Sequence, residues 1–291
     1  MNGFLVIDKP SGMTSHDVVA KIRKRFGTKR VGHAGTLDPM ATGVLVIGLG
    51  NATKLMQYVV DGSKSYEATI ALGAATHTDD KEGNVISVAN PEVLKKVTED
   101  EIRTEINKFV GKILQRPSSV SAIKVDGKTA HQRVRDGETV DLPPREVVIS
   151  KIEILSVEYL EKAILVRVVV DCSAGTYIRA IARDLGEALN VGGHLTVLRR
   201  SLVSPFSISE AGGIDDSAII ETAEGISRIL PIRLLDFEEM NEISFGRSIG
   251  SNPAEGIFAA LSPANSFAAL LENKESSGKV MAAPKLVAVQ E

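Results

Sequence analysis

The sequence predicts an α/β protein with a small β domain at its C-terminal end, and three observations support this. The chain has 291 residues, which suits one large domain or two unequal ones. Residues 1–230 alternate runs that have the apolar periodicity of strands and of helices. In residues 231–291, short apolar runs alternate with Pro and Gly breaks, as in a small β domain. We therefore expect one domain over 1–230 and another over 231–291.

The first elements are a strand, a helix and a loop. Residues 3–9 form a short buried strand that Pro10 stops. A helix follows, with Ser15 as its N-cap. The apolar face of this helix consists of Val18, Ile22 and Phe26. Residues 30–43 (RVGHAGTLDPMATG) form a loop, because Gly, Pro and hydroxyl residues favour turns, and such loops often carry function.

The middle of the chain adds a strand with a short helix (43–60), an alternating strand (66–72) and a polar turn (77–84). Residues 91–111 include an amphipathic helix. Its inward side chains are Ile102, Ile106, Phe109 and Val110.

Residues 115–145 form a long basic excursion from the body. Apolar periodicity fades there, and basic side chains accumulate: Arg116, Lys124, Lys128, His131, Arg133, Arg135 and Arg145. Loops of this length are usually functional or mobile.

The body ends with two strands, a helix and a further β segment. They cover residues 147–160, 163–171, 177–189 and 201–209. Thr176 is the expected N-cap of the helix, which puts Arg179 in the first turn. A cation is disfavoured there by the helix dipole, so we expect an anion to face Arg179.

Charge is distributed unevenly along the chain. The net charge is −3, which taken alone argues against a nucleic-acid binder. Residues 205–291 contain 6 basic and 13 acidic residues, so residues 1–204 contain 34 − 6 = 28 basic and 37 − 13 = 24 acidic ones. Much of the basic excess lies in KIRKRFGTKR (21–30), which is either a nucleic-acid contact or a solvated helix face.

Several classes of protein are excluded. The single cysteine, Cys172, rules out a disulfide framework. No secretory signal or membrane-spanning run is present, so we expect a soluble, cytoplasmic protein. Phosphate-loop, HExxH and GxSxG motifs are missing, and the five histidines lack the spacing of metal ligands. We therefore expect neither a metal nor a cofactor.

The remaining candidates for chemistry are a carboxylate, arginines and tyrosines. Asp38 lies in the Gly-rich loop before a proline, where it either acts on a ligand or forms an Asx turn. Arg183 lies one turn after Arg179 on the same flank of the helix. It either belongs to the same site or forms a surface ion pair with Asp184 or Glu187. Tyr66 starts an aliphatic strand face, so we expect its ring at the edge of the core with its hydroxyl near solvent. This position suits either stacking on a flat ligand or an ordinary core-edge tyrosine.

Five blocks of the sequence, in order, resemble the TruB family of bacterial tRNA pseudouridine synthases. They are KPSGMTSHDVV, GHAGTLDPMATGVLVIGLGNATK, KSYEATIALG, RPSSVSAIKVDGKTAHQRVRDG and CSAGTYIRAIARDLG. The similarity runs from about residue 3 to 200, and the pair of GTLDP and SxGTYIR blocks is specific. The resemblance implies a central mixed, mostly antiparallel sheet flanked by helices.

The resemblance also implies roles for individual residues. Asp38 matches the catalytic aspartate, Tyr66 the tyrosine that stacks on the target base, and Arg179 the arginine that pairs with the catalytic carboxylate. The substrate-binding residues that it implies are Tyr177 and Leu198 in the base pocket and His33, which enters the space vacated by the flipped nucleotide.

The RNA-binding regions follow from the same resemblance. Residues 115–145 correspond to a flexible RNA-clamping insertion, and 231–291 occupy the place of a PUA-like domain. The TDTxD stretch of the family is changed here to THTDD (76–80). We expect RNA contacts from the basic helix and the insertion, namely Lys21, Lys24, Arg25, Lys124, His131 and Arg133.

The implied function is isomerisation of uridine 55 in the T-loop of tRNA by base flipping, performed by a monomer without a cofactor. Cleavage of the glycosidic bond and rejoining through C5 change no oxidation state, which agrees with the missing cofactor motifs. Whether Asp38 acts covalently or removes a sugar proton stays open. An RNA-binding or tRNA-folding protein without turnover is the alternative. A hydrolase with paired carboxylates is disfavoured, because no second carboxylate lies near either block.

Overall fold

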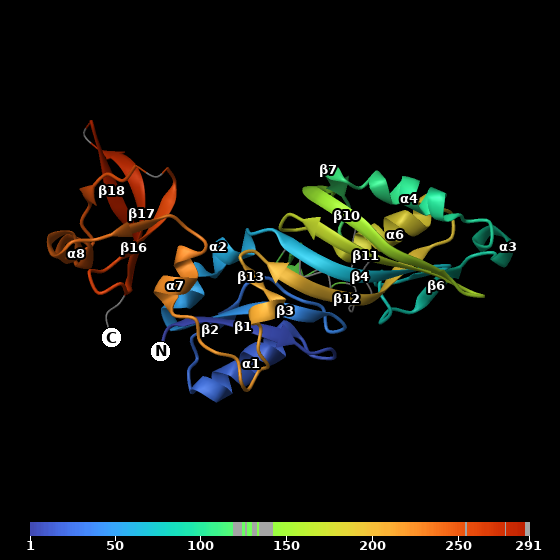
Figure 1. Cartoon of the computed structure of the whole chain (residues 1–291), viewed down its shortest axis with the longest axis horizontal. Coiled ribbons are helices and arrows are strands. Elements are labelled where there is room, and N and C mark those ends of the chain that lie inside the picture. Colours follow the sequence, from blue (N-terminus) through green and yellow to red (C-terminus); the bar gives the residue numbers. More distant parts are fainter. Residues whose placement is uncertain are drawn as a thin grey trace.

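The computed structural model describes residues 1–118, 124–125, 127–129, 133, 142–253, 255–276 and 278–288. Within them, a nine-stranded sheet forms the body, and a five-stranded sheet lies at one end of the long axis (Figure 1). Strands β7 (Gly111–Gln115) and β6 (Val85–Val88) lie toward the opposite end.

The large sheet is mixed and mostly antiparallel, as expected. Its main path runs β1-β3-β12-β4-β11-β10-β7, while β2 pairs with β3 and β13 with β12. The parallel pair in it is β12 with β3, so β12 joins the N-terminal strands to the rest of the sheet. The remaining bounds are β1 (Gly3–Lys9), β2 (Val31–His33), β3 (Thr42–Leu49), β4 (Lys64–Leu72), β10 (Arg145–Tyr159), β11 (Ile164–Cys172), β12 (Gly193–Val203) and β13 (Phe206–Ser207).

Strands β1 and β3 are buried on both faces, which explains their continuous apolar sequences. Leu5 and Leu45 belong to one apolar cluster with side chains of three helices, α1 (Ser15–Phe26), α4 (Glu99–Asn107) and α6 (Ile178–Ala188). Phe4 and Val44 belong to a second cluster on the opposite face. That face is covered by the 3-10 helix η1 (Gly50–Leu55), α2 (Met56–Val60) and α7 (Thr222–Ser227).

The N-caps of two helices differ from the expected residues. Thr14, not Ser15, caps α1 and forms a capping box with Asp17. The Ser15 hydroxyl instead exchanges two hydrogen bonds with the backbone of Leu37, at 2.9 and 3.2 Å. Through these two hydrogen bonds, Ser15 attaches the start of α1 to the loop that carries Asp38. In the second helix, α6, the N-cap is Tyr177 rather than Thr176, and no side chain caps it.

Residues 91–111 contain two helices instead of one, α3 (Pro91–Leu94) and α4. Ile102 and Ile106 are buried as expected. Val110 is 42% exposed, because α4 ends before it and the chain turns into β7. A two-stranded sheet of β5 (Ala74–Thr76) and β6 precedes them.

The C-terminal region forms the expected small β structure. Its sheet has the order β14-β16-β17-β18-β15. The elements are β14 (Ile232–Leu234), α8 (Phe237–Ser244), β15 (Ile249–Gly250), β16 (Ile257–Leu261), β17 (Phe267–Ser276) and β18 (Lys279–Val287). Ala259 and Leu270 of this sheet share the second apolar cluster with the body. The division into domains at residue 231 stays a prediction.

Gly43 provides a test of the junction between β3 and β12. Its φ is +100°, and a β-carbon there would lie 2.2 Å from the carbonyl oxygen of Arg200. We expect Gly43→Ala to lower the free energy of unfolding by at least about 2 kcal/mol, from steric overlap and backbone strain. Urea denaturation measures the loss. Gly12→Ala is the control, because Gly12 has φ +83° and open space around it. Equal losses in the two variants would show that the overlap contributes nothing.

Candidate active site

A small pocket lies over one face of β4 and β12, where the loop before β3 meets the start of α6. Its volume is about 280 Å³. In the sheet register Tyr66 lies opposite Arg200, and Lys64 opposite Cys172, so these side chains share one face. The lining residues are Gly35, Thr36, Leu37, Asp38, Val60, Lys64, Tyr66, Ala174, Gly175, Thr176, Tyr177, Ile178, Arg179, Leu198 and Arg200.

The loop that carries Asp38 is held by two buried cations. Lys9, at the end of β1, donates to the carbonyl oxygens of Pro10, Met13 and Pro39 at 2.9, 2.7 and 3.3 Å. Burial lowers the pKa of the Lys9 ammonium. Arg200 donates to the carbonyl oxygen of Gly35 at 3.1 Å. Asp38 is therefore presented from a fixed backbone, with its side chain 31% exposed.

Arg179 binds Asp38, as its place in the first helical turn predicted. Its Nε lies 3.0 Å from Oδ2 of Asp38, and a terminal nitrogen lies 3.3 Å from Oδ1. This two-point contact fixes both the position and the orientation of the carboxylate. The expectation that an anion faces Arg179 is confirmed.

The structure adds a second carboxylate to Arg179, which the sequence had not indicated. The other terminal nitrogen of Arg179 lies 3.4 Å from Oδ2 of buried Asp80 and donates to the carbonyl oxygen of Thr78 at 3.0 Å. Asp80 also accepts from the Thr78 hydroxyl at 2.5 Å and from the Glu82 amide at 3.0 Å. The prediction that no second carboxylate lies nearby is therefore wrong, because the polar turn 77–84 contacts the arginines of α6. Both carboxylate oxygens of Asp80 already have hydrogen-bond or ion-pair partners, so Asp80 serves as a binding partner of Arg179.

Arg183 forms a parallel set of contacts one turn along α6. It lies 3.2 Å from Asp79 and 2.8 Å from Asp184, and it donates to the carbonyl oxygen of Arg116 at 2.8 Å. The proposed partner Asp184 is thus found, and Asp79 is added. Burial raises the pKa values of Asp79 and Asp184. The turn 77–84 is fastened to α6 by two arginine–aspartate contacts.

The apolar part of the pocket includes Tyr66 and Leu198, with Tyr177 just before α6. Tyr66 is only 7% exposed, so the expected place of its hydroxyl near solvent is wrong. It faces Arg200 instead, and burial raises the pKa of the phenol. The backbone of Tyr177 exchanges two hydrogen bonds with the side chain of Gln115, at 2.8 and 3.1 Å.

His33 lies on β2, beside the pocket and not among its lining residues. Its ring packs edge-on against His16, with the centroids 5.5 Å apart. Burial lowers the pKa of the His33 imidazole, which favours the neutral ring. Its Nδ1 is buried without a hydrogen-bond partner.

The predicted RNA-contacting residues fall into four groups. Lys21 and Lys24 are exposed on α1. Arg25 donates to Ile214 and Ser217 in three hydrogen bonds of 2.8–3.0 Å, so its guanidinium attaches α1 to the segment before α7. In the insertion, Lys124 belongs to the short strand β8 (Lys124–Val125), which pairs with β9 (Lys128–Thr129), and Arg133 is partly buried. His131 lies outside the described residues.

Two further cations in the pocket were missed by sequence reasoning. Lys64 donates to the carbonyl oxygens of Val60 and Gly62 at 2.5 and 2.6 Å, and burial lowers its pKa to about 8. Arg200 is 1% exposed. The neighbouring Arg199 points to the other face and binds Asp8 at 2.8 Å. Two consecutive arginines in an alternating strand could have indicated that one of them is buried.

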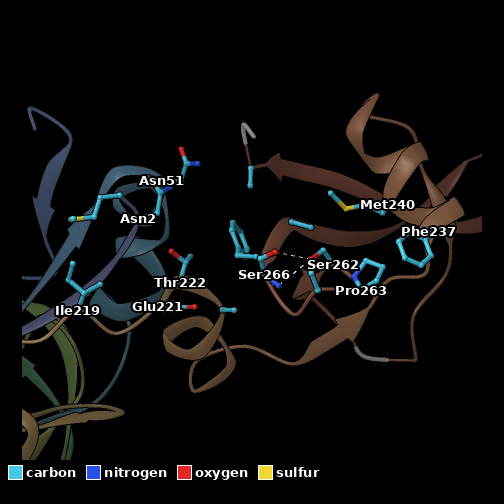
Figure 2. A pocket seen from close by; sticks show the side chains of 16 residues that line it. Asn2, Asn51, Ile219, Glu221, Thr222, Phe237, Met240, Ser262, Pro263 and Ser266 are labelled. Carbon is cyan, nitrogen blue, oxygen red and sulfur yellow. Dashed lines mark hydrogen bonds between the residues drawn. The ribbon is translucent and has the colours of Figure 1, made fainter. Parts of the chain in front are cut away.

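A larger cavity, of about 990 Å³, lies between the body and the C-terminal sheet. Figure 2 shows Thr222 and Asn51 on one side of it and Ser262 and Phe237 on the other. Glu221 is the ionisable side chain among the described lining residues, so this cavity lacks the charges that the smaller pocket gathers.

No group of three or more possible metal-binding side chains occurs in the described part of the chain. In that same part, no helix is long and apolar enough to cross a membrane.

The chain is similar to known proteins in both sequence and fold. Residues 23–178 match the family model described as TruB family pseudouridylate synthase (N terminal domain). The chain is 48% identical over 278 residues to tRNA pseudouridine synthase B of Corynebacterium diphtheriae, covering 94% of this chain and 93% of the relative. It is 47% identical over 286 residues to the protein of the same name from Arthrobacter sp., covering 93% and 92%.

Solved structures show the same fold. An H/ACA RNP bound to a substrate RNA containing 2′-deoxyuridine matches with a TM-score of 0.70 at 23% identity, covering 99% of this chain and 85% of the other. A Cbf5-Nop10-Gar1 complex matches with a TM-score of 0.66 at 26% identity, covering 99% and 84%. The fold and the matched sequence define a pseudouridine synthase, which is an isomerase. The chain belongs to the TruB family of pseudouridylate synthases.

Proposed function

We propose that this enzyme converts uridine 55 in the T-loop of tRNA to pseudouridine, with Asp38 as the essential catalytic carboxylate. The observation that carries the proposal is the two-point contact between Asp38 and Arg179 at a pocket that also contains Tyr66. The names of the relatives, tRNA pseudouridine synthase B, support tRNA as the substrate.

The residues in and beside the pocket have separate roles in the proposed reaction. Arg179 holds the Asp38 carboxylate aimed at the sugar, where it either attacks C1′ or removes a sugar proton. The target uridine must leave its stack, which costs a few kcal/mol. Stacking on Tyr66 and contact with Leu198 offset part of this cost. His33, beside the pocket, is suited to the space that the flipped nucleotide leaves.

The direct test is tritium release from T-arm RNA that carries tritium at C5 of uridine. The C5 hydrogen is lost only if the base is rejoined to the sugar through that carbon. Release by the enzyme supports the proposed reaction. RNA that is bound without release would favour the alternative, an RNA-binding or tRNA-folding protein without turnover.

Exposed lysines of α1 are the proposed phosphate contacts. Neutralising both in Lys21→Gln/Lys24→Gln should weaken T-arm binding roughly tenfold and lower the salt slope of log K by roughly 1.5, because each phosphate contact releases counterions. Fluorescence anisotropy at several salt concentrations measures both. Lys95→Gln/Lys96→Gln is the matched control, since these exposed lysines lie at α3, toward the other end of the molecule (Figure 1). An unchanged salt slope in the α1 variant would show that these lysines form a solvated helix face and do not contact phosphates.

The insertion 115–145 and the region 231–291 are proposed to add RNA contacts, as the resemblance implied. Arg25 is left out of the phosphate contacts, because its guanidinium is engaged with Ile214 and Ser217.

A further inference from the structure

The floor of the pocket contains two buried cations, Lys64 and Arg200, beside Tyr66. All three side chains lie on the same face of adjacent strands β4 and β12. Lys64 is 7% exposed and Arg200 is 1% exposed. Burial of a charge is costly unless the charge is paired. The presence of both cations in this pocket therefore needs an explanation.

The carboxylates of the site do not neutralise them. Asp38 and Asp80 are both bound to Arg179. Neither Lys64 nor Arg200 forms an ion pair with a carboxylate among the described residues. Other groups that act on Lys64 are Arg200 from β12, the thiol of Cys172 from β11 and Asp61 after α2. The thiol is neutral, since burial raises its pKa to about 11. The floor of the pocket thus has an excess of positive charge.

The two cations differ in how many of their N–H donors remain available to a group bound in the pocket. Arg200 donates to the carbonyl oxygens of Val44, Gly35 and Thr36 at 2.8, 3.1 and 3.5 Å, and it lies opposite Tyr66 in the sheet. It is consequently occupied in holding the loop of Asp38. An ammonium group has three N–H donors, and Lys64 uses two of them for Val60 and Gly62. The third is available to a group in the pocket that Lys64 lines.

We propose that Lys64 stabilises the negative charge that the uracil ring acquires when the N1–C1′ bond breaks. The inference rests on the proposed function. The electron pair of the broken bond stays on the base and spreads over N1, O2 and O4, while Asp38 compensates the electron-deficient sugar. C5 of the base then bonds to C1′, the C5 hydrogen leaves as a proton, and N1 takes up a proton. Atoms and electrons balance, and no further reactant is needed.

A phosphate of the RNA is a less suitable partner for Lys64. The ammonium lies at the floor, on the same strand face as Tyr66, in a pocket of about 280 Å³. A charge that forms only during the reaction is stabilised most by a fixed donor in a site without bulk water. The lowered pKa of Lys64, about 8, adds a pH dependence: the protonated, active form is lost as the pH rises through that value.

The test compares Lys64→Met and Lys64→Arg with the parent enzyme under single-turnover conditions. Two T-arm RNAs are used, with uridine or 5-fluorouridine at the target position, and loss of the target nucleoside is followed after nuclease digestion. Fluorine at C5 makes the base a better leaving group. We expect Lys64→Met to slow uridine turnover about 100-fold. With 5-fluorouridine the defect should be roughly ten times smaller. Lys64→Arg should retain most of the rate and keep it at pH 9.

Lys95→Met controls for loss of an exposed lysine, and thermal unfolding with RNA affinity controls for folding. Equal defects on the two substrates would overturn the inference, as would an unchanged rate in Lys64→Met. A weaker affinity with a flatter salt slope would overturn it too, because it would assign Lys64 to a phosphate. Tritium release is measured for the parent enzyme and for each variant. If the proposed function itself fails, the parent releases no tritium, which distinguishes that failure from the results above.

Discussion

Asp38→Asn is expected to lower the rate of tritium release by at least about 10⁴-fold, the scale seen when a group essential to bond cleavage is removed. The amide has nearly the shape of the carboxylate, so the loop should keep its hydrogen bonds through Ser15, Lys9 and Arg200. It can neither attack a sugar carbon nor take a proton.

Affinity for T-arm RNA is expected to stay within several-fold of the parent, because the phosphate contacts proposed on α1 are untouched. Glu82→Gln is a suitable control, since Glu82 is a nearby carboxylate that the reaction does not use. A variant with asparagine at position 38 that still turned over would remove Asp38 from its proposed role.

Arg179→Ala is expected to lower turnover by about 10²–10³-fold, comparable to the loss of one preorganised electrostatic donor. The variant leaves Asp38 without its two-point partner and also leaves Asp80 buried without a cation. Stranding a buried charge costs about 3 kcal/mol or more, so stability should fall as well.

These two losses can be separated with Arg179→Ala/Asp80→Asn. Replacing the stranded carboxylate should restore much of the melting temperature, whereas the turnover rate should stay low because Asp38 is still unsupported. Single-turnover tritium release and calorimetry measure the two quantities. Recovery of the rate together with stability would show that Arg179 acts only on folding.

Local sequence patterns predicted much of this fold because its elements bury apolar faces at regular spacing. The alternation in β4, the two-sided burial of β1 and the amphipathic α6 all appear in the sequence. The same reasoning predicted an anion at Arg179, since a cation in a first helical turn requires one. The arrangement of the strands in the sheet came only from the family resemblance.

The parts of the site that escaped prediction depend on contacts between distant segments. Asp80 lies in a polar turn that resembles any solvated loop until the turn is seen against α6. Lys64 begins a strand, where a lysine is ordinarily solvent-exposed, and its burial depends on α2 and β11. Arg200 could be recognised only through its register with Tyr66 in β12 and β4.

The position of β12 also determines when the pocket can exist during protein synthesis. Residues 199–200 pair with 42–43 of β3, and residues 193–203 pair with 64–72 of β4. A nascent chain that ends before residue 193 lacks the strand that joins these partners, together with Leu198 and Arg200. It would leave edges of β3 and β4 unpaired, and such edges favour association with other chains. Pairing across such long sequence separations is slow. The pocket of the proposed active site is therefore a late product of folding, and a truncated chain should aggregate before this pocket forms.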